Sequence, residues 1–124
     1  TWQSQKQKIV ALSSCEAEYV AATTAACQGI WLSRLEGELL VEEAGAITIF
    51  VNNRSAIQLC KNPVFHDRSK HIDVRFHFIR RCVEEEKIRV KHIATGDQLA
   101  DIFTKSLGRT RFLELHARIG MVEV

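Results

Sequence analysis

Hydrophobic residues recur at helical spacing over a long stretch near the start of the chain, from Ser13 to about Leu40. Ser13 and Glu16 have the spacing of a capping box, in which each side chain satisfies a free backbone N–H of the first turn. The pattern therefore predicts a helix over 13–40. We expect its buried stripe to comprise Val20, Ala21, Ala25, Ile30, Trp31 and Leu35.

Two shorter stretches, 46–52 and 87–94, alternate between residue types as β-strands do. In the first stretch both alternating sets contain apolar residues, which favours a strand covered on two faces. Thr95 and Gln98 repeat the capping-box spacing, and Gly108 and Gly120 each follow a helical pattern. The further helices that these patterns predict are 54–62, 72–86, 97–107 and 109–120.

Strands that are separated by helices pair in parallel, so the order of elements predicts an α/β fold. The chain has 124 residues, which is enough for a single domain over 1–124. Two strands make a small sheet. We therefore expect further strands from residues before Thr1 or from a partner chain.

Composition narrows the class of protein. Hydrophobic residues make up 46% and charged residues 26%, which excludes a disordered chain. No apolar run approaches the roughly 18 residues of a membrane helix. The four cysteines include no CxxC pair, so a zinc site is not indicated. We interpret them as reduced and mostly buried, and expect an intracellular protein of the cytoplasm or nucleus.

Charge is uneven along the chain. Residues 1–45 hold three Lys or Arg against six Glu, whereas residues 61–92 hold nine Lys or Arg against five Asp or Glu. The basic segment is a candidate phosphate-binding surface, and the plain alternative is a solvated helix face. The candidate nucleic-acid contacts are Arg68, Lys70 and Arg75, with Arg80 and Arg81 contributing charge.

Two carboxylates and one amide are candidates for metal chemistry. Glu18 precedes Ala21 and Ala22 by about a turn, so a ligand has room beside it. Asp101 lies a turn inside its expected helix, where it gains little from the helix dipole. Each could instead be a surface residue, and Lys105 could pair with Asp101 at i,i+4. Together with Asn52 at a strand end, they are the oxygen ligands that a hard cation such as Mg²⁺ prefers.

Three long segments resemble a known family: "KQKIVALSSCEAEYVAA", "NNRSAIQLCKNPVFHDRSKHIDVRFHFIRR" and "DQLADIFTKSLGRTRF". They are similar to the ribonuclease H domain at the end of a copia-type retrotransposon polyprotein. The resemblance implies a ribonuclease H-like fold, a mixed sheet flanked by helices. It also implies cleavage of the RNA strand of an RNA–DNA hybrid by two Mg²⁺ (or Mn²⁺) ions that four carboxylates hold.

The resemblance assigns roles residue by residue. The helix glutamate of the family falls on Glu18, and the aspartate of the C-terminal helix falls on Asp101. The strand-end aspartate falls on Asn52. The first aspartate belongs to an N-terminal strand, and the resemblance implies that this chain lacks the first two strands and keeps only the end of the third at 1–4.

An amide at position 52 supplies a carbonyl oxygen but no negative charge. Four positive charges would then face only Glu18 and Asp101, so we predict little or no ribonuclease activity. Three hypotheses stay open: an active Mg-dependent ribonuclease H, a module that binds an RNA–DNA hybrid or duplex without cleavage, and a protein-interaction or assembly module. The last could form a homodimer, or bind another protein, through an exposed sheet edge.

Overall fold

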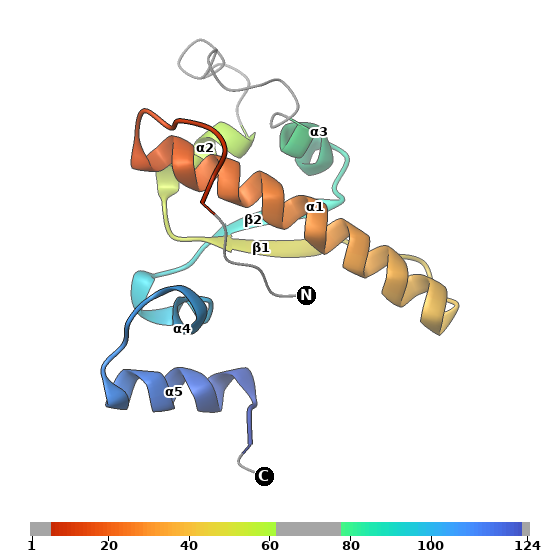
Figure 1. Cartoon of the computed structure of the whole chain (residues 1–124). Helices are drawn as coiled ribbons and strands as arrows, with labels where there is room; N and C mark the ends of the chain where they lie inside the picture. Colours follow the sequence, from red (N-terminus) through yellow and green to blue (C-terminus); the bar gives the residue numbers. More distant parts are fainter. Residues whose placement is uncertain (1–5, 62–77, 123–124) are drawn as a thin grey trace. The chain divides into compact units, whose positions relative to one another are not determined.

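The computed structural model describes residues 6–61 and 78–122 (Figure 1). The chain divides into two compact units, one of residues 7–93 and one of residues 94–124 together with 1–6. The larger unit contains a sheet and three helices, and the smaller contains short helical segments. The single domain over 1–124 stays a prediction.

Helix α1, Ser14–Leu40, begins and ends where the sequence predicts. The N–H of Glu16 donates to Ser13 Oγ at 3.2 Å, and Glu16 Oε2 accepts the N–H of Leu12 at 2.7 Å. The glutamate thus reaches one residue further back than a standard capping box. Val41, with φ 57°, ends the helix in the left-handed region, and its N–H donates to the carbonyl oxygen of Gly37.

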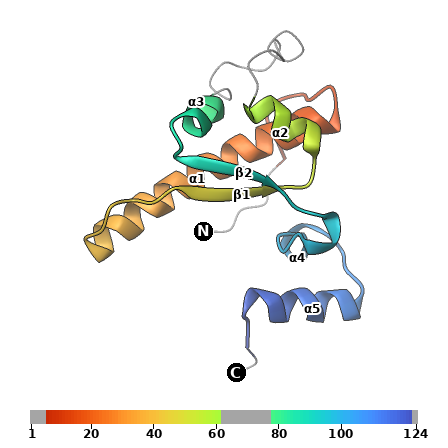
Figure 2. The same ribbon diagram turned by 180° about the vertical axis from the view of Figure 1, so that it is seen from behind.

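The two predicted strands, β1 (Ile47–Val51) and β2 (Ile88–His92), are confirmed and pair in parallel. Their register aligns Ile47 with Ile88 and Val51 with His92. Between them the structure describes α2, Arg54–Lys61, and α3, Phe78–Glu84. Figures 1 and 2 show α2 and α3 above the two strands, and α1 crossing the strands at an angle.

The sheet is covered on one face among the described residues. Ile88 and Val90 are buried, whereas Thr48 and Phe50 on the other face of β1 are exposed, Phe50 to 51%. The helices of the larger unit thus cover one face of β1, and the expectation of a strand covered on both faces stays a prediction. The core beneath the helices comprises Tyr19, Val20, Ala22, Ala26, Val51, Ala56, Ile57, Leu59, Cys60, Ile79, Cys82, Ile88 and Val90.

The buried face of α1 differs from the predicted stripe. Ala22 and Ala26 are buried, whereas Trp31 is 53% exposed and Leu35 is exposed too. A Cβ on Gly29 would collide with the side chain of Ile47, so the helix lies very close to β1 at this point. Small residues permit that approach. Of the bulky residues in the second half of α1, Ile30 packs against the core, whereas Trp31, Leu32 and Leu35 are exposed. The prediction that Trp31 lies in the core was wrong for this reason.

In the smaller unit, the predicted helix over 97–107 is replaced by two short segments. These are the 3₁₀ turn η3, Thr95–Asp97, and α4, Asp101–Thr104. No side-chain hydrogen bond caps η3, so the second capping box was a wrong prediction. Asp, Thr and β-branched Ile are weak helix formers, and a short segment of them does not sustain a longer helix.

Helix α5, Arg109–Ile119, is confirmed and ends at Gly120. Gly120 has φ 83°, a left-handed conformation that glycine adopts without a steric cost. Arg111 donates to the carbonyl oxygen of Gly96, and Arg118 lies 3.3 Å from Asp97. These contacts join α5 to η3.

The fold is α/β, with helices flanking a small sheet. It is compatible with the ribonuclease H-like fold that the resemblance implies, although two strands are seen in the described residues. Among those residues, no helix has the length and hydropathy needed to span a bilayer.

Candidate metal centre

Two asparagines follow β1, and they have different surroundings. Asn53 is the N-cap of α2, because its Oδ1 accepts the N–H of Ala56 at 3.0 Å. Asn52, half-buried, lies between the last strand residue and this cap. The N–H of Ile93 donates to the carbonyl oxygen of Val51 at 3.0 Å, so the carboxyl ends of both strands meet beside Asn52. In open parallel sheets this end is where ligands bind.

Glu18 lies toward the same end of the sheet as Asn52. Helix α1 runs antiparallel to β1, since Gly29 packs on Ile47 and Ser33 Oγ donates to the carbonyl oxygen of Gly45 at 3.1 Å (Figure 1). Going back along the helix from Gly29 to Glu18 covers roughly 16 Å. Going forward along the strand from Ile47 to Asn52 covers roughly 16 Å as well.

Glu18 also lies on the side of α1 that faces the sheet. Because Gly29 follows it by about three helical turns, the two share a face with Ala22 and Ala26. Those two alanines are buried, and Glu18 is half-buried. A carboxylate at the end of a ridge of small residues, toward the same end of the sheet as Asn52, is compatible with the predicted ligand. Its binding of metal stays a prediction.

Asp101 is the first residue of α4, in the unit that begins at Ala94, whereas Glu18 and Asn52 belong to the unit 7–93. Its Oδ2 lies 3.0 Å from Lys105 Nζ, which confirms the expected i,i+4 pair. The side chain of Asp101 is 14% exposed and that of Lys105 is 49% exposed. The convergence of Asp101 with Glu18 and Asn52 stays a prediction.

Within residues 6–61 and 78–122, no group of three or more His, Cys, Asp or Glu side chains could hold a metal ion. The chain therefore does not offer a compact metal cage within either unit as described. A site for Mg²⁺ would therefore need ligands from separate elements, namely the residues that the resemblance assigns, Glu18, Asn52 and Asp101.

The residues expected to contact nucleic acid differ in whether the structure describes them and in how exposed they are. Arg68, Lys70 and Arg75 lie outside the described residues. Arg80 is only 6% exposed, so the expectation that its charge faces phosphate was wrong. Its neighbour Arg81 has a side chain that is 74% exposed.

Arg80 instead joins three helices. Its Nε donates to the carbonyl oxygen of Leu59 in α2 at 2.8 Å, and its guanidinium lies 5.8 Å from the ring centre of Tyr19 in α1. Among the residues that the structure describes, Nη1 and Nη2 are buried without a hydrogen-bond partner. The sequence could not reveal this burial, because Arg80 and Arg81 are adjacent and chemically identical. Only the packing of α3 on α1 and α2 distinguishes them.

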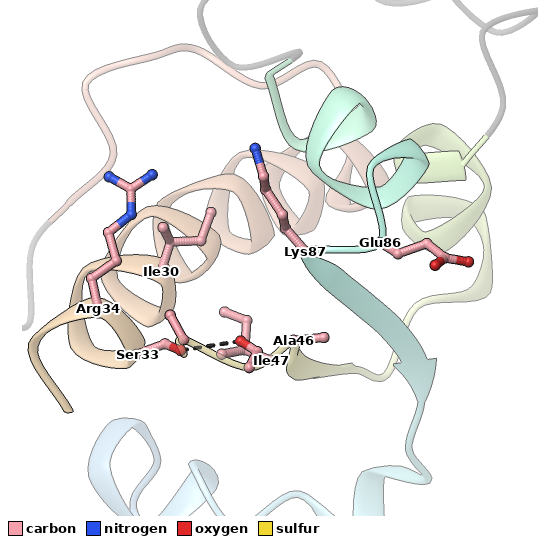
Figure 3. A pocket seen from close by; sticks show the side chains of 9 residues that line it. Ile30, Ser33, Arg34, Ala46, Ile47, Glu86 and Lys87 are labelled. Atoms are coloured by element: carbon pink, nitrogen blue, oxygen red, sulfur yellow. Dashed lines mark hydrogen bonds between the residues drawn. The ribbon is translucent and has the colours of Figure 1, made fainter. Parts of the chain in front are cut away.

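A pocket of about 190 Å³ lies at the opposite end of β1 from Asn52 (Figure 3). Ile30, Ser33 and Arg34 of α1 face Ile47 and Lys87 across it. In Figure 3 the side chains of Arg34 and Lys87 extend toward the same side. Because it lies at the amino end of the strands, this pocket is separate from the candidate metal centre.

All four cysteines are free thiols, in agreement with the expectation that they are reduced. Cys60 and Cys82 are buried, Cys15 is half-buried and Cys27 is exposed. Burial raises the pKa of the Cys60 thiol to about 12, which makes it a poor nucleophile at neutral pH.

Comparison with known proteins places the chain among mobile-element sequences. It is 43% identical, over 98% of its length, to the "Retrovirus-related Pol polyprotein from transposon TNT 1-94" of Nicotiana tabacum, of which it covers 9%. It is 43% identical over its whole length to the corresponding polyprotein of transposon RE1 from Arabidopsis thaliana, and 42% identical to that of transposon RE2. It covers 8% of each.

The chain thus spans less than a tenth of the length of these relatives. No family model matches it, and no solved structure matches it.

Proposed function

Because the whole chain corresponds to a segment of retrotransposon Pol polyproteins, it is a retroelement-derived sequence, and we propose that it is a ribonuclease H-like domain with a degenerate metal site. The domain would act as a nucleic-acid-binding or protein-interaction and assembly module instead of cleaving RNA. The observation that carries this proposal is Asn52 at the carboxyl end of β1, toward the same end of the sheet as Glu18.

The physical reason is electrostatic. Bound Mg²⁺ ions would stabilise the negative charge that develops when a phosphodiester is cleaved, and they would need anionic oxygen ligands to offset their own charge. Glu18 and Asp101 would supply carboxylates, and Asn52 would supply only a neutral carbonyl oxygen. Each tenfold loss of rate corresponds to about 1.4 kcal/mol of barrier. Weaker binding of one ion would reduce the stabilisation of charge in the transition state, and we expect a rate lower by several such factors.

Binding without cleavage fits the charge of the chain. Exposed cations in the larger unit outside the β2 edge, among them Arg54 and Arg81, would attract phosphate oxygens. Phosphate contacts release counterions, so binding to an RNA–DNA hybrid should weaken steeply as salt is raised. Salt-independent binding would count against a nucleic-acid role.

Hydrolysis of a labelled RNA–DNA hybrid in Mg²⁺ or Mn²⁺ tests the degenerate site. The wild-type chain should show little cleavage, and Asn52→Asp should raise the rate because it restores the missing carboxylate. Asn53→Asp is a matched control, since it adds the same charge one residue away and aspartate still caps α2. An equal gain from both variants would mean that general charge, and not the ligand at position 52, sets the rate.

The alternative is an active Mg-dependent ribonuclease H. Robust cleavage by the wild-type chain, abolished by Glu18→Gln, would establish that activity and overturn the degenerate site. The half-buried position of Glu18, in α1 near the carboxyl end of β1, is compatible with this alternative.

A further inference from the structure

Strand β2 has one edge that β1 does not use. At its two ends, the carbonyl oxygen of Lys87 accepts the N–H of Ile47, and the N–H of Ile93 donates to the carbonyl oxygen of Val51. Because backbone direction alternates along a strand, the N–H and C=O groups of Ile88, Val90 and His92 point away from β1. In the sheet that the described residues form, β1 is the only neighbour of β2.

A groove of about 390 Å³ follows this edge. It is lined by four consecutive residues of β2, 88–91, together with Val83 of α3, Lys61 at the end of α2, and Glu86. Because the side chains of Ile88 and Val90 are buried, these two residues line the groove with their backbone groups. The groove therefore runs along β2, where an additional strand would lie.

The groove is cationic. Lys61, Arg89 and Lys91 line it, and Glu86 is its one carboxylate. Across residues 6–61 and 78–122, none of these three cations belongs to an ion pair. Their charge is thus not neutralised by the neighbouring described side chains.

We propose that this groove binds an extended acidic peptide segment, which adds to the sheet as a strand beside β2. Strand addition satisfies both the donors and the acceptors of a free edge, and charged side chains of the ligand give the specificity. Acidic residues of the added strand would lie beside Arg89 and Lys91, and its apolar residues would lie beside Ile88 and Val90 on the side of the helices. This binding does not depend on the metal centre at position 52.

Two other occupants fit less well. A second copy of β2 would bring Arg89 and Lys91 against their own counterparts, and like charges across a strand pair repel. Cationic side chains on an edge strand commonly prevent such self-pairing. A nucleic acid could use the cations and the free N–H groups, but its phosphate oxygens only accept, so the carbonyl oxygens of Ile88, Val90 and His92 would gain no donor.

Fluorescence anisotropy of the full chain with a labelled octapeptide of alternating glutamate and valine tests the proposal. We expect saturable binding that weakens about tenfold or more in the double variant Arg89→Glu/Lys91→Glu, since charge complementarity is reversed. Arg34→Glu, an exposed cation of the same unit outside the groove, is the matched control and should bind as the wild type does.

A second peptide removes dependence on the fold of any variant. The same octapeptide, N-methylated at alternate residues, keeps its charge but loses the donors that strand addition requires, so its binding should be lost. Equal binding of both peptides, or no saturable binding of the first, would overturn the proposal. A different result would assign the groove to nucleic acid. An RNA–DNA hybrid would displace the peptide, and the double variant would lower the affinity for the hybrid but not for the peptide.

Discussion

At the scale of single residues, Arg80 illustrates how one position can bear on both packing and charge. A buried guanidinium is costly unless it is paired, and within the described part of the chain only Nε has a hydrogen-bond partner. The side chain nevertheless satisfies the carbonyl oxygen of Leu59 near the end of α2 and packs over the ring of Tyr19. Its long stem and the single hydrogen bond join α1, α2 and α3.

We predict that Arg80→Ala lowers the free energy of unfolding by about 2–4 kcal/mol, because it leaves a cavity and an unpaired carbonyl oxygen. Arg80→Met should cost less, since it keeps the stem and removes the unpaired Nη atoms. Urea unfolding followed by circular dichroism measures both. Arg81→Ala is the control, because Arg81 is exposed and its loss should change stability by less than about 0.5 kcal/mol. Equal losses for the two alanine variants would contradict the contacts of Arg80.

A second residue-scale prediction concerns alkaline pH. Burial raises the pKa of Cys60 from 9.0 to about 12 and that of Tyr19 from 10.0 to about 12. Their neutral forms are thus favoured in the folded state, and the unfolded state releases protons first as pH rises. The stability they contribute is fully present below pH 9 and is lost between pH 9 and 12.

The free energy of unfolding should therefore fall above pH 9, by about 1.4 kcal/mol per pH unit for each such group once it ionises in the unfolded state. Urea unfolding at a series of pH values from 7 to 11 measures the slope. Cys60→Ala should make the slope near pH 10 shallower. An unchanged slope in that variant would mean that Cys60 titrates alike in both states.

At the scale of elements, α1 depends on small residues where it crosses β1. Gly29→Leu should destabilise the fold by about 1–3 kcal/mol, because the added side chain must displace Ile47 from a close contact. Ala25→Leu, on an exposed position of the same helix, serves as the control and should be close to neutral. Thermal unfolding of the two variants measures the difference. If both behave alike, the helix does not approach the strand as closely as described.

Periodicity predicted the position of α1, of both strands and of α5, since each has a clear repeat and a recognisable end. It did not predict which side of α1 is buried. Apolar residues occur around the whole second half of that helix, and the sheet selected Ala22, Ala26 and Gly29 over Trp31 and Leu35 because close packing needs small side chains. The split of the expected helix over 97–107 shows a second limit. A capping-box spacing predicts a helix start only when the residues that follow sustain a helix.

At the scale of the whole molecule, the candidate site was only partly accessible to sequence reasoning. The special position of Asn52 follows from the strand pattern and the resemblance, and α1 carries Glu18 toward the same end of the sheet. The groove along β2 was missed because Lys61 and Lys91 are far apart in sequence and meet only through the packing of α2 and α3 on the sheet. Alternation of Arg89 and Lys91 with Ile88 and Val90 was the one signal in the sequence.

The proposed loss of a carboxylate ligand at position 52 predicts an effect of metal on stability that does not require catalysis. A ligand that binds only the folded state stabilises it by mass action, by about 1.4 kcal/mol when its concentration is ten times the dissociation constant. Adding Mg²⁺ or Mn²⁺ should therefore raise the unfolding temperature of Asn52→Asp more than that of the wild-type chain, in which position 52 has no charge to offer the ion. Differential scanning calorimetry at increasing metal concentration measures the shift.

Combining Asn52→Asp with Glu18→Gln should cancel the gain, because one carboxylate is removed as the other is added. Asn53→Asp alone should not produce the gain. A wild-type chain that responds to metal as strongly as Asn52→Asp does would mean that the amide at the strand end does not weaken the site.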